Sequence, residues 1–142
     1  MRTKPFVMLS SVVAASVGCG LFGPDPALSH AFAMIGLGPA DGPVPIIVLA
    51  HDPIDCAKPS FPYVAMNFGE SGQLSARTWD IAADVTPSVS YVTWPGKSEA
   101  PISGTVTVTS VDNSKVEGSV DLQFPSRTVT KPFSAPWVQP CR

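Results

Sequence analysis

The sequence predicts an all-β fold: an antiparallel β-sandwich or small barrel of about seven or eight strands, with one disulfide. Apolar and polar residues alternate over residues 102–124, which is typical of strands with one buried face. The chain has 16 prolines and 11 glycines in 142 residues. Long helices are therefore disfavoured, because a proline removes a backbone donor and clashes inside a helix. Candidate strands recur at a spacing of about ten residues, as in sandwiches and barrels.

The clearest element is a hairpin between residues 102 and 124. In Ile102–Val111, apolar residues alternate with serines and threonines, and this pattern places Ile102 on the buried face. A polar turn follows at 112–115, where Asp and Asn side chains can bond the local backbone. Val116–Phe124 then alternates in the same way, so the chain is expected to fold back as a second half-buried strand.

Other segments supply the remaining strands. Arg127–Ser134 is the next candidate, and Pro132 places it at a sheet edge or at a bulge, because proline cannot donate to a ladder. Pro45–His51 is apolar on both parities, as expected of a central strand covered on both faces. Further candidates are Pro62–Phe68, Ser88–Trp94, Ala31–Leu37 and Trp79–Ala83, the last of which is also open to a helix.

The N-terminus has the pattern of an export signal. Arg2 and Lys4 precede an apolar run, Phe6–Val17. This run is shorter than the stretch of about 20 residues that a membrane helix requires, and it fits the apolar region of a signal peptide. The run ends in 16–19, Ser-Val-Gly-Cys, which resembles the lipobox of bacterial lipoproteins. That resemblance implies fatty acyl chains, such as palmitate, on Cys19. Ser16 stands where the pattern most often has leucine, so cleavage without lipidation, after Gly18 or after Ala31, stays open.

The chain therefore divides into three parts. Residues 1–18 form the signal peptide, 19–30 a Gly- and Pro-rich, lipid-anchored tether, and 31–142 a single β-domain. Loss of the signal peptide removes two cations, which leaves seven cations against eleven acids, a net charge of −4. We expect no nucleic-acid partner, because the mature chain has no basic stripe to meet phosphates.

The cysteine count fits this interpretation. There are three cysteines, Cys19, Cys56 and Cys141, and an odd number in an exported protein requires an explanation. If Cys19 carries lipid, the other two can form one disulfide in an oxidising compartment. It would close a loop of about 85 residues, for which the chain-entropy model gives about 4 to 5 kcal/mol of stabilisation. Two free, buried thiols are the alternative.

Most of the mature chain resembles a group of small bacterial envelope lipoproteins with β-sandwich domains and no characterised function. The shared features are a strand leading to a first cysteine (Ile47–Cys56), a late hairpin (Gly104–Val108 with Val116–Phe124) and a terminal F-x-A-P-x-x-x-C (Phe133–Cys141). The resemblance supports the fold and the disulfide, and it carries no catalytic residue across. Gly20 after the lipobox cysteine favours the outer membrane, by analogy with the common bacterial sorting pattern.

No catalytic or metal-binding constellation stands out. His51, Asp52 and Asp55 form the densest group of potential ligands, but a metal needs three or more convergent ligands, and the chain has only one other histidine, His30. Asp52-Pro53 is better explained as the start of a turn. The sequence has no G-x-S-x-G motif, which would mark a nucleophilic serine. Gly69–Gly72 comes nearest, but its second glycine directly follows the serine. We expect neither an enzyme nor a cofactor, and a small exported hydrolase using His51 is the least favoured function.

The aromatic residues suggest a binding role. Large rigid rings on a surface can stack on sugar rings or form a contact patch for another protein. The alternative is that Trp79 and Tyr91 fill the core, whereas Trp94, beside a Pro-Gly turn, is expected to be exposed. The predicted function is thus a lipid-anchored envelope protein that presents a non-enzymatic binding or structural domain to an envelope protein or a glycan. A carbohydrate-binding module using Trp94, Tyr91 and Trp79 is one alternative, and secretion as a soluble protein is another.

Overall fold

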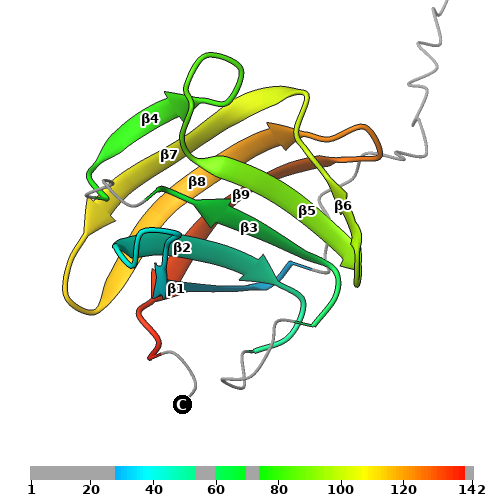
Figure 1. Ribbon diagram of the computed structural model, residues 1–142. Coiled ribbons are helices and arrows are strands. Elements are labelled where there is room, and N and C mark those ends of the chain that lie inside the picture. Colours follow the sequence, from blue (N-terminus) through cyan, green and yellow to red (C-terminus); the bar gives the residue numbers. More distant parts are fainter. Residues whose placement is uncertain (1–27, 54–59, 70–73, 140–142) are drawn as a thin grey trace, which may run out of the picture.

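A computed structural model describes residues 28–53, 60–69 and 74–139, which form nine strands in two antiparallel sheets and no helix (Figure 1). The predicted all-β antiparallel fold is confirmed, and of the two predicted forms, sandwich or barrel, it is the sandwich, with nine strands instead of about seven or eight. The five-stranded sheet has the order β1-β2-β3-β5-β6, and the four-stranded sheet has the order β4-β7-β8-β9. The strands are β1 (His30–Leu37), β2 (Pro43–Ala50), β3 (Tyr63–Asn67), β4 (Arg77–Asp80), β5 (Ser88–Trp94), β6 (Lys97–Glu99), β7 (Ser103–Val111), β8 (Lys115–Gln123) and β9 (Thr128–Pro136). Within these residues there is no helix that could span a membrane.

The main hydrophobic core lies between the two sheets. Inward-facing residues of both sheets are fully or almost fully buried, as alternation along each strand requires. Each large apolar side chain removed from water contributes about 1.5 to 3 kcal/mol. The five-stranded sheet supplies Ala33, Ile47, Leu49, Val64, Met66, Val89 and Tyr91, and the four-stranded sheet supplies Trp79, Val106, Val108, Val116, Val120, Leu122, Val129, Phe133 and Ala135.

The β7–β8 hairpin has the predicted faces, with one exception. Val106 and Val108 are buried, and the intervening threonines lie on the opposite face. Ile102 is 63% exposed, so its expected burial is wrong. Ile102 directly precedes the strand, and its N–H donates to the Gln123 carbonyl at the last rung of the hairpin. Its side chain therefore lies at the end of the sheet and not in the middle of the buried face.

Strand β2 is central, as its apolar residues on both parities predict. Ile47 and Leu49 face the main core, whereas Val48 and Ala50 face the opposite side of the sheet. There they form a second buried cluster with Phe32, against which Met34, Ile46, Tyr63, Ala65 and Val138 pack. Strand β2 therefore has buried apolar residues on both of its faces.

Two segments differ from the sequence-based expectation. Strand β6 was not predicted, because its three residues Lys-Ser-Glu show no apolar alternation. It pairs with β5 through a turn at Gly96, whose φ is 75°. The strand expected over Trp79–Ala83 ends at Asp80, where the Asp80 side chain accepts a hydrogen bond from the Ala82 N–H at 2.9 Å and turns the chain.

The packed domain begins earlier than predicted. Leu28 is fully buried in the main core, although residues 28–30 had been assigned to the tether. The amino group of Lys131 on β9 donates a hydrogen bond to the Leu28 carbonyl, and Ser29 Oγ donates to the His51 carbonyl at 3.2 Å. Leu28 and Ser29 are thus packed against the sheets, and His30 begins β1. The β-domain therefore includes at least residues 28–30 of the predicted tether.

Strand β9 lies at the edge of its sheet, as Pro132 predicts. The chain just after β9 then reaches across to the other sheet. Trp137 forms an isolated parallel bridge with Ala33 of β1, and the Val138 N–H donates to the Ala33 carbonyl at 2.8 Å. The two sheets are thus joined along one side by backbone hydrogen bonds.

Candidate binding site

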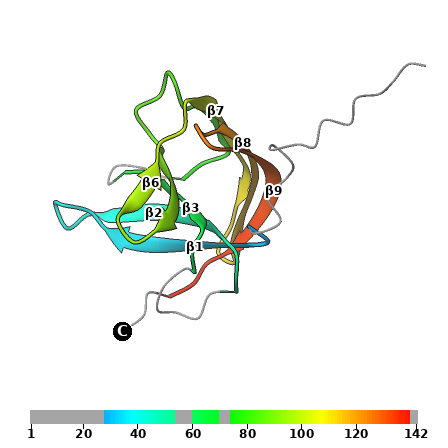
Figure 2. The ribbon, with the colours of Figure 1, turned by 90° about the vertical axis from the view of Figure 1, so that its right-hand side faces the viewer.

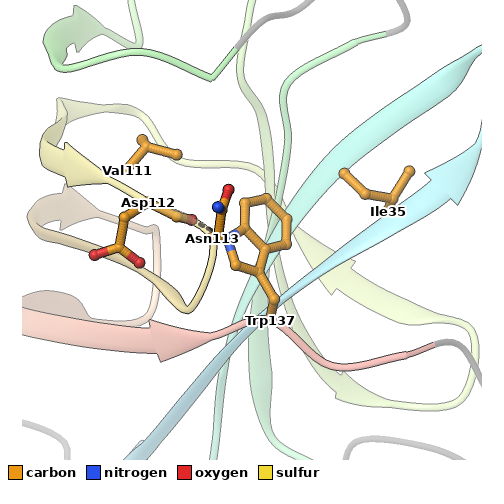
Figure 3. A pocket seen from close by; sticks show the side chains of 5 residues that line it. All are labelled: Ile35, Val111, Asp112, Asn113 and Trp137. Carbon is orange, nitrogen blue, oxygen red and sulfur yellow. Dashed lines mark hydrogen bonds between the residues drawn. The ribbon is translucent and has the colours of Figure 1, made fainter.

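A pocket of about 420 Å³ opens at one end of the sandwich (Figure 3). It is lined by residues of both sheets and of the chain that joins them: Ile35 of β1, Val111, Asp112 and Asn113 at the β7–β8 turn, and Trp137 after β9. This volume lies within the range of about 300 to 1,000 Å³ that is common for ligand sites. Its lining is mainly apolar, with Asp112 and Asn113 as the polar residues.

Trp137 is fixed at this site by two hydrogen bonds to the turn. Its backbone N–H donates to the Ser114 carbonyl at 3.0 Å, and its indole Nε1 donates to the Asp112 carbonyl at 2.9 Å. Because both bonds tie the same residue to the same turn, the indole is held in one orientation. Figure 3 shows the ring between the turn and Ile35, which lies on the other side of the pocket.

Asp112 builds the turn that holds Trp137. Its Oδ1 accepts hydrogen bonds from the Ser114 N–H at 2.7 Å, the Ser114 hydroxyl at 2.6 Å and the Lys115 N–H at 2.9 Å. These hydrogen bonds lower the pKa of Asp112 below its usual value, with the largest effect from the Ser114 hydroxyl and smaller effects from the two backbone N–H groups. The carboxylate points away from the indole (Figure 3), so it organises the loop and leaves the pocket wall apolar.

Trp79 and Tyr91 fill the core, which is the alternative to a sugar-stacking platform that the sequence analysis gave. Trp79 and Tyr91 are 5% and 0% exposed, which is a correction to their candidate role in sugar stacking. Trp79 packs against Phe68 with ring centroids 5.1 Å apart, and Tyr91 against Phe124 at 5.5 Å. Both side chains point inward because of strand parity. Trp94, at the end of β5, is 66% exposed, as expected.

The candidate metal ligands show little organisation. His51 Nε2 lies 3.9 Å from Asp52 Oδ1, and both side chains are more than half exposed. Asp55 lies outside the described residues. In residues 28–53, 60–69 and 74–139, no group of three His, Cys, Asp or Glu side chains could hold a metal ion. His51 and Asp52 therefore supply at most two of the ligands that a metal site requires.

All three cysteines, Cys19, Cys56 and Cys141, also lie outside the described residues. Their neighbours bear on the predicted disulfide. Ala50, six residues before Cys56, and Val138, three residues before Cys141, belong to the same apolar cluster. The described parts of the two segments therefore lie in one region, and the pairing stays a prediction.

Comparison of the chain with protein-family models, with curated proteins and with solved structures gives no match. Function has to be inferred from the chain's own residues. Among these, Trp137 had no distinct signal in the sequence, because its contact with residues 112–114 depends on the register of β8 with β9, which pairs Lys115 with Pro136.

Proposed function

We propose that this protein is a lipid-anchored protein of the bacterial envelope, in the outer membrane, which presents its β-sandwich as a non-enzymatic binding module. The observation that carries the proposal is the short distance along the chain between the export signal and the fold. The signal ends at Cys19, and Leu28 is already buried in the core.

The tether limits how far the module can move from the membrane. Nine residue steps from Cys19 to Leu28 span at most about 30 Å when fully extended. This is roughly the diameter of a small domain. A lipid on Cys19 would therefore keep the sandwich beside the membrane surface, where it can contact other envelope components.

The pocket supports a role in binding. Ile35 and Val111 are 43% and 37% exposed, and together with the fixed Trp137 they form an apolar patch that Asp112 and Asn113 also line. An apolar surface that holds a rigidly placed aromatic ring supplies contact area for a ligand or for another macromolecule. Because the Asp112 carboxylate is engaged in its turn, the part it plays at this end of the sandwich is to hold the loop beside the apolar surface.

The anchor is tested by labelling with radioactive palmitate in a bacterial host. We expect label in the wild-type protein and in Cys56→Ala, but none in Cys19→Ala, because only the sulfur of Cys19 lies at the end of the signal. Label retained in Cys19→Ala at the wild-type level would contradict the anchor. Cys56→Ala is the matched control, since it removes a cysteine without touching the signal.

A carbohydrate-binding function is the second candidate, favoured by Trp94 alone. Its 66% exposure leaves an indole face free at the end of β5 to stack on a sugar ring. Under this function, Trp94→Ala should lose retention on insoluble peptidoglycan by tenfold or more, with no change in melting temperature.

Ile102→Ala is the control for that experiment, because Ile102 is similarly exposed, at 63%, on another strand connection. We expect Ile102→Ala to be retained like the wild type. Equal retention of the wild type and Trp94→Ala would exclude Trp94 as a sugar-binding residue.

A further inference from the structure

The four sheet edges differ in how they are protected from pairing with other strands. Natural proteins protect edges with charged residues, prolines or very short strands. Three edges follow this rule. Strand β4 is four residues long with Arg77 and Asp80, β6 is three residues long with Lys97 and Glu99, and β9 contains Lys131, Pro132 and Pro136.

The second half of β1 lacks all of these devices. Residues 34–37, Met-Ile-Gly-Leu, contain neither a charge nor a proline. The β1–β2 hairpin to which they belong extends beyond the rest of the sandwich (Figure 2). With respect to the residues that the structure describes, its outer edge is therefore an accessible, apolar pairing edge.

Among residues 28–53, 60–69 and 74–139, the backbone of this edge has hydrogen-bonding groups without a backbone partner. The Ala33 carbonyl points away from β2, because it accepts a hydrogen bond from Val138. The pairing of β1 with β2 has no register shift, and backbone groups of alternate residues in a strand point to the same side. The N–H and C=O groups of Ile35 and Leu37 therefore also point away from β2. In the described part of the chain no backbone group bonds to them.

The side chains at this edge are complementary to each other. Ile35 and Leu37 lie on the same face of β1, since they are two residues apart. Leu37 is 81% exposed and projects from the hairpin, whereas Ile35 forms one wall of the pocket. One short segment thus carries both an exposed leucine and part of an apolar pocket.

We propose that two copies of the protein pair antiparallel through residues 35–37 of β1, about a two-fold axis at Gly36. Ile35 then lies directly opposite the partner's Leu37, and directly opposite residues share a face of the sheet. The leucine is thereby placed at the mouth of the pocket formed by Ile35, Val111 and Trp137. The contact is self-complementary, because each copy gives a leucine and receives one.

The pairing also uses the backbone groups of this edge. Ile35 and the partner's Leu37 form a hydrogen-bonded pair, and the symmetric pair forms on the other side of the axis. The two Gly36 residues then form a non-hydrogen-bonded pair, with Cα atoms about 4.5 Å apart. A second copy fits better than an unrelated ligand, since it supplies an edge, a leucine and a pocket of matching spacing. The pairing does not depend on lipidation, although a shared membrane would raise the effective concentration of the copies.

Cross-linking of the full-length protein in membranes tests the proposal. Cysteines introduced by Gly36→Cys would face each other across the axis, within the range of about 4.4 to 6.8 Å that disulfides require. We expect mild oxidation to convert most of Gly36→Cys to a dimer. Val85→Cys is the control for random collision, because Val85 is 95% exposed on the β4–β5 connection. It should give at least tenfold less dimer.

A second change tests the role of the leucine. Leu37→Asp, added to Gly36→Cys, should reduce the dimer at least tenfold, because it brings a charge to an apolar pocket, whereas Leu37→Met should preserve it. Equal yields from Gly36→Cys and Val85→Cys, or yields unchanged by Leu37→Asp, would overturn the proposal.

A Cβ at position 36 would lie 2.9 Å from Ile46 Cδ1, so the Ile46 side chain would have to shift in Gly36→Cys. Sedimentation of the detergent-extracted protein therefore supplies a measurement that does not need this substitution. We expect the wild type to sediment as a dimer and Leu37→Asp as a monomer. A wild type that stays monomeric at all concentrations would refute the pairing, whether or not Cys19 carries palmitate.

Discussion

Replacing Gly118 with alanine is expected to lower the melting temperature by about 10 °C or more. A Cβ at this position would overlap the Thr107 carbonyl oxygen of the neighbouring strand and would lie 2.8 Å from Phe133 Cζ. A backbone atom cannot move aside without separating β7 from β8. Overpacking of this kind costs about 3 kcal/mol, and more where the backbone must shift. Thermal unfolding followed by circular dichroism measures the effect.

Gly96→Ala is the matched control for that experiment. Gly96 has a φ of 75° and no atom within 4 Å of its added Cβ, so only backbone strain of about 1 to 2 kcal/mol opposes the alanine. Its melting temperature should fall clearly less than that of Gly118→Ala. Equal shifts for the two variants would show that the close approach of β7 and β8 at Gly118 is not needed for stability.

Removing the predicted disulfide is expected to have the second large effect. Cys141→Ser should lower the free energy of unfolding of the oxidised protein by about 4 kcal/mol, because the unfolded chain regains the freedom of a long closed loop. Urea unfolding of the exported protein, with and without reductant, measures the change. The reduced wild type should unfold at the same urea concentration as the variant.

The partner cysteine gives the internal check. Cys56→Ser should lose as much stability as Cys141→Ser, and the double variant should lose little more, since each single change already removes the same bond. If both thiols of the exported wild type react with an alkylating reagent, the disulfide does not exist. The free-thiol alternative would then hold.

The fold was predictable where burial alternates along a strand. The β7–β8 hairpin, the central position of β2 and the edge position of β9 all follow from apolar parity or from a proline. Local pattern suffices at these places, because each strand has one apolar face or two. Strand β6 was missed, since three charged and polar residues pair only where β5 already presents a backbone ladder.

The candidate site was much less predictable. Composition marks the aromatic residues but does not say which face of a strand each one occupies, and Trp79 and Tyr91 proved to be core residues. Trp137 gains its place from contacts with Asp112 and Ser114, more than 20 residues earlier in the chain. Such contacts depend on the pairing of whole strands, and no short motif records them.

The way the chain enters the fold has a mechanical consequence. A pull on the N-terminal segment would act first on Leu28, which is buried in the core and bonded through its carbonyl to Lys131 of the opposite sheet. For the N-terminal segment to be pulled out, β1 would have to slide along its axis between β2 and the chain at Val138. This movement would break its hydrogen bonds to both neighbours. A load applied at Leu28 would therefore be shared by the two sheets at once.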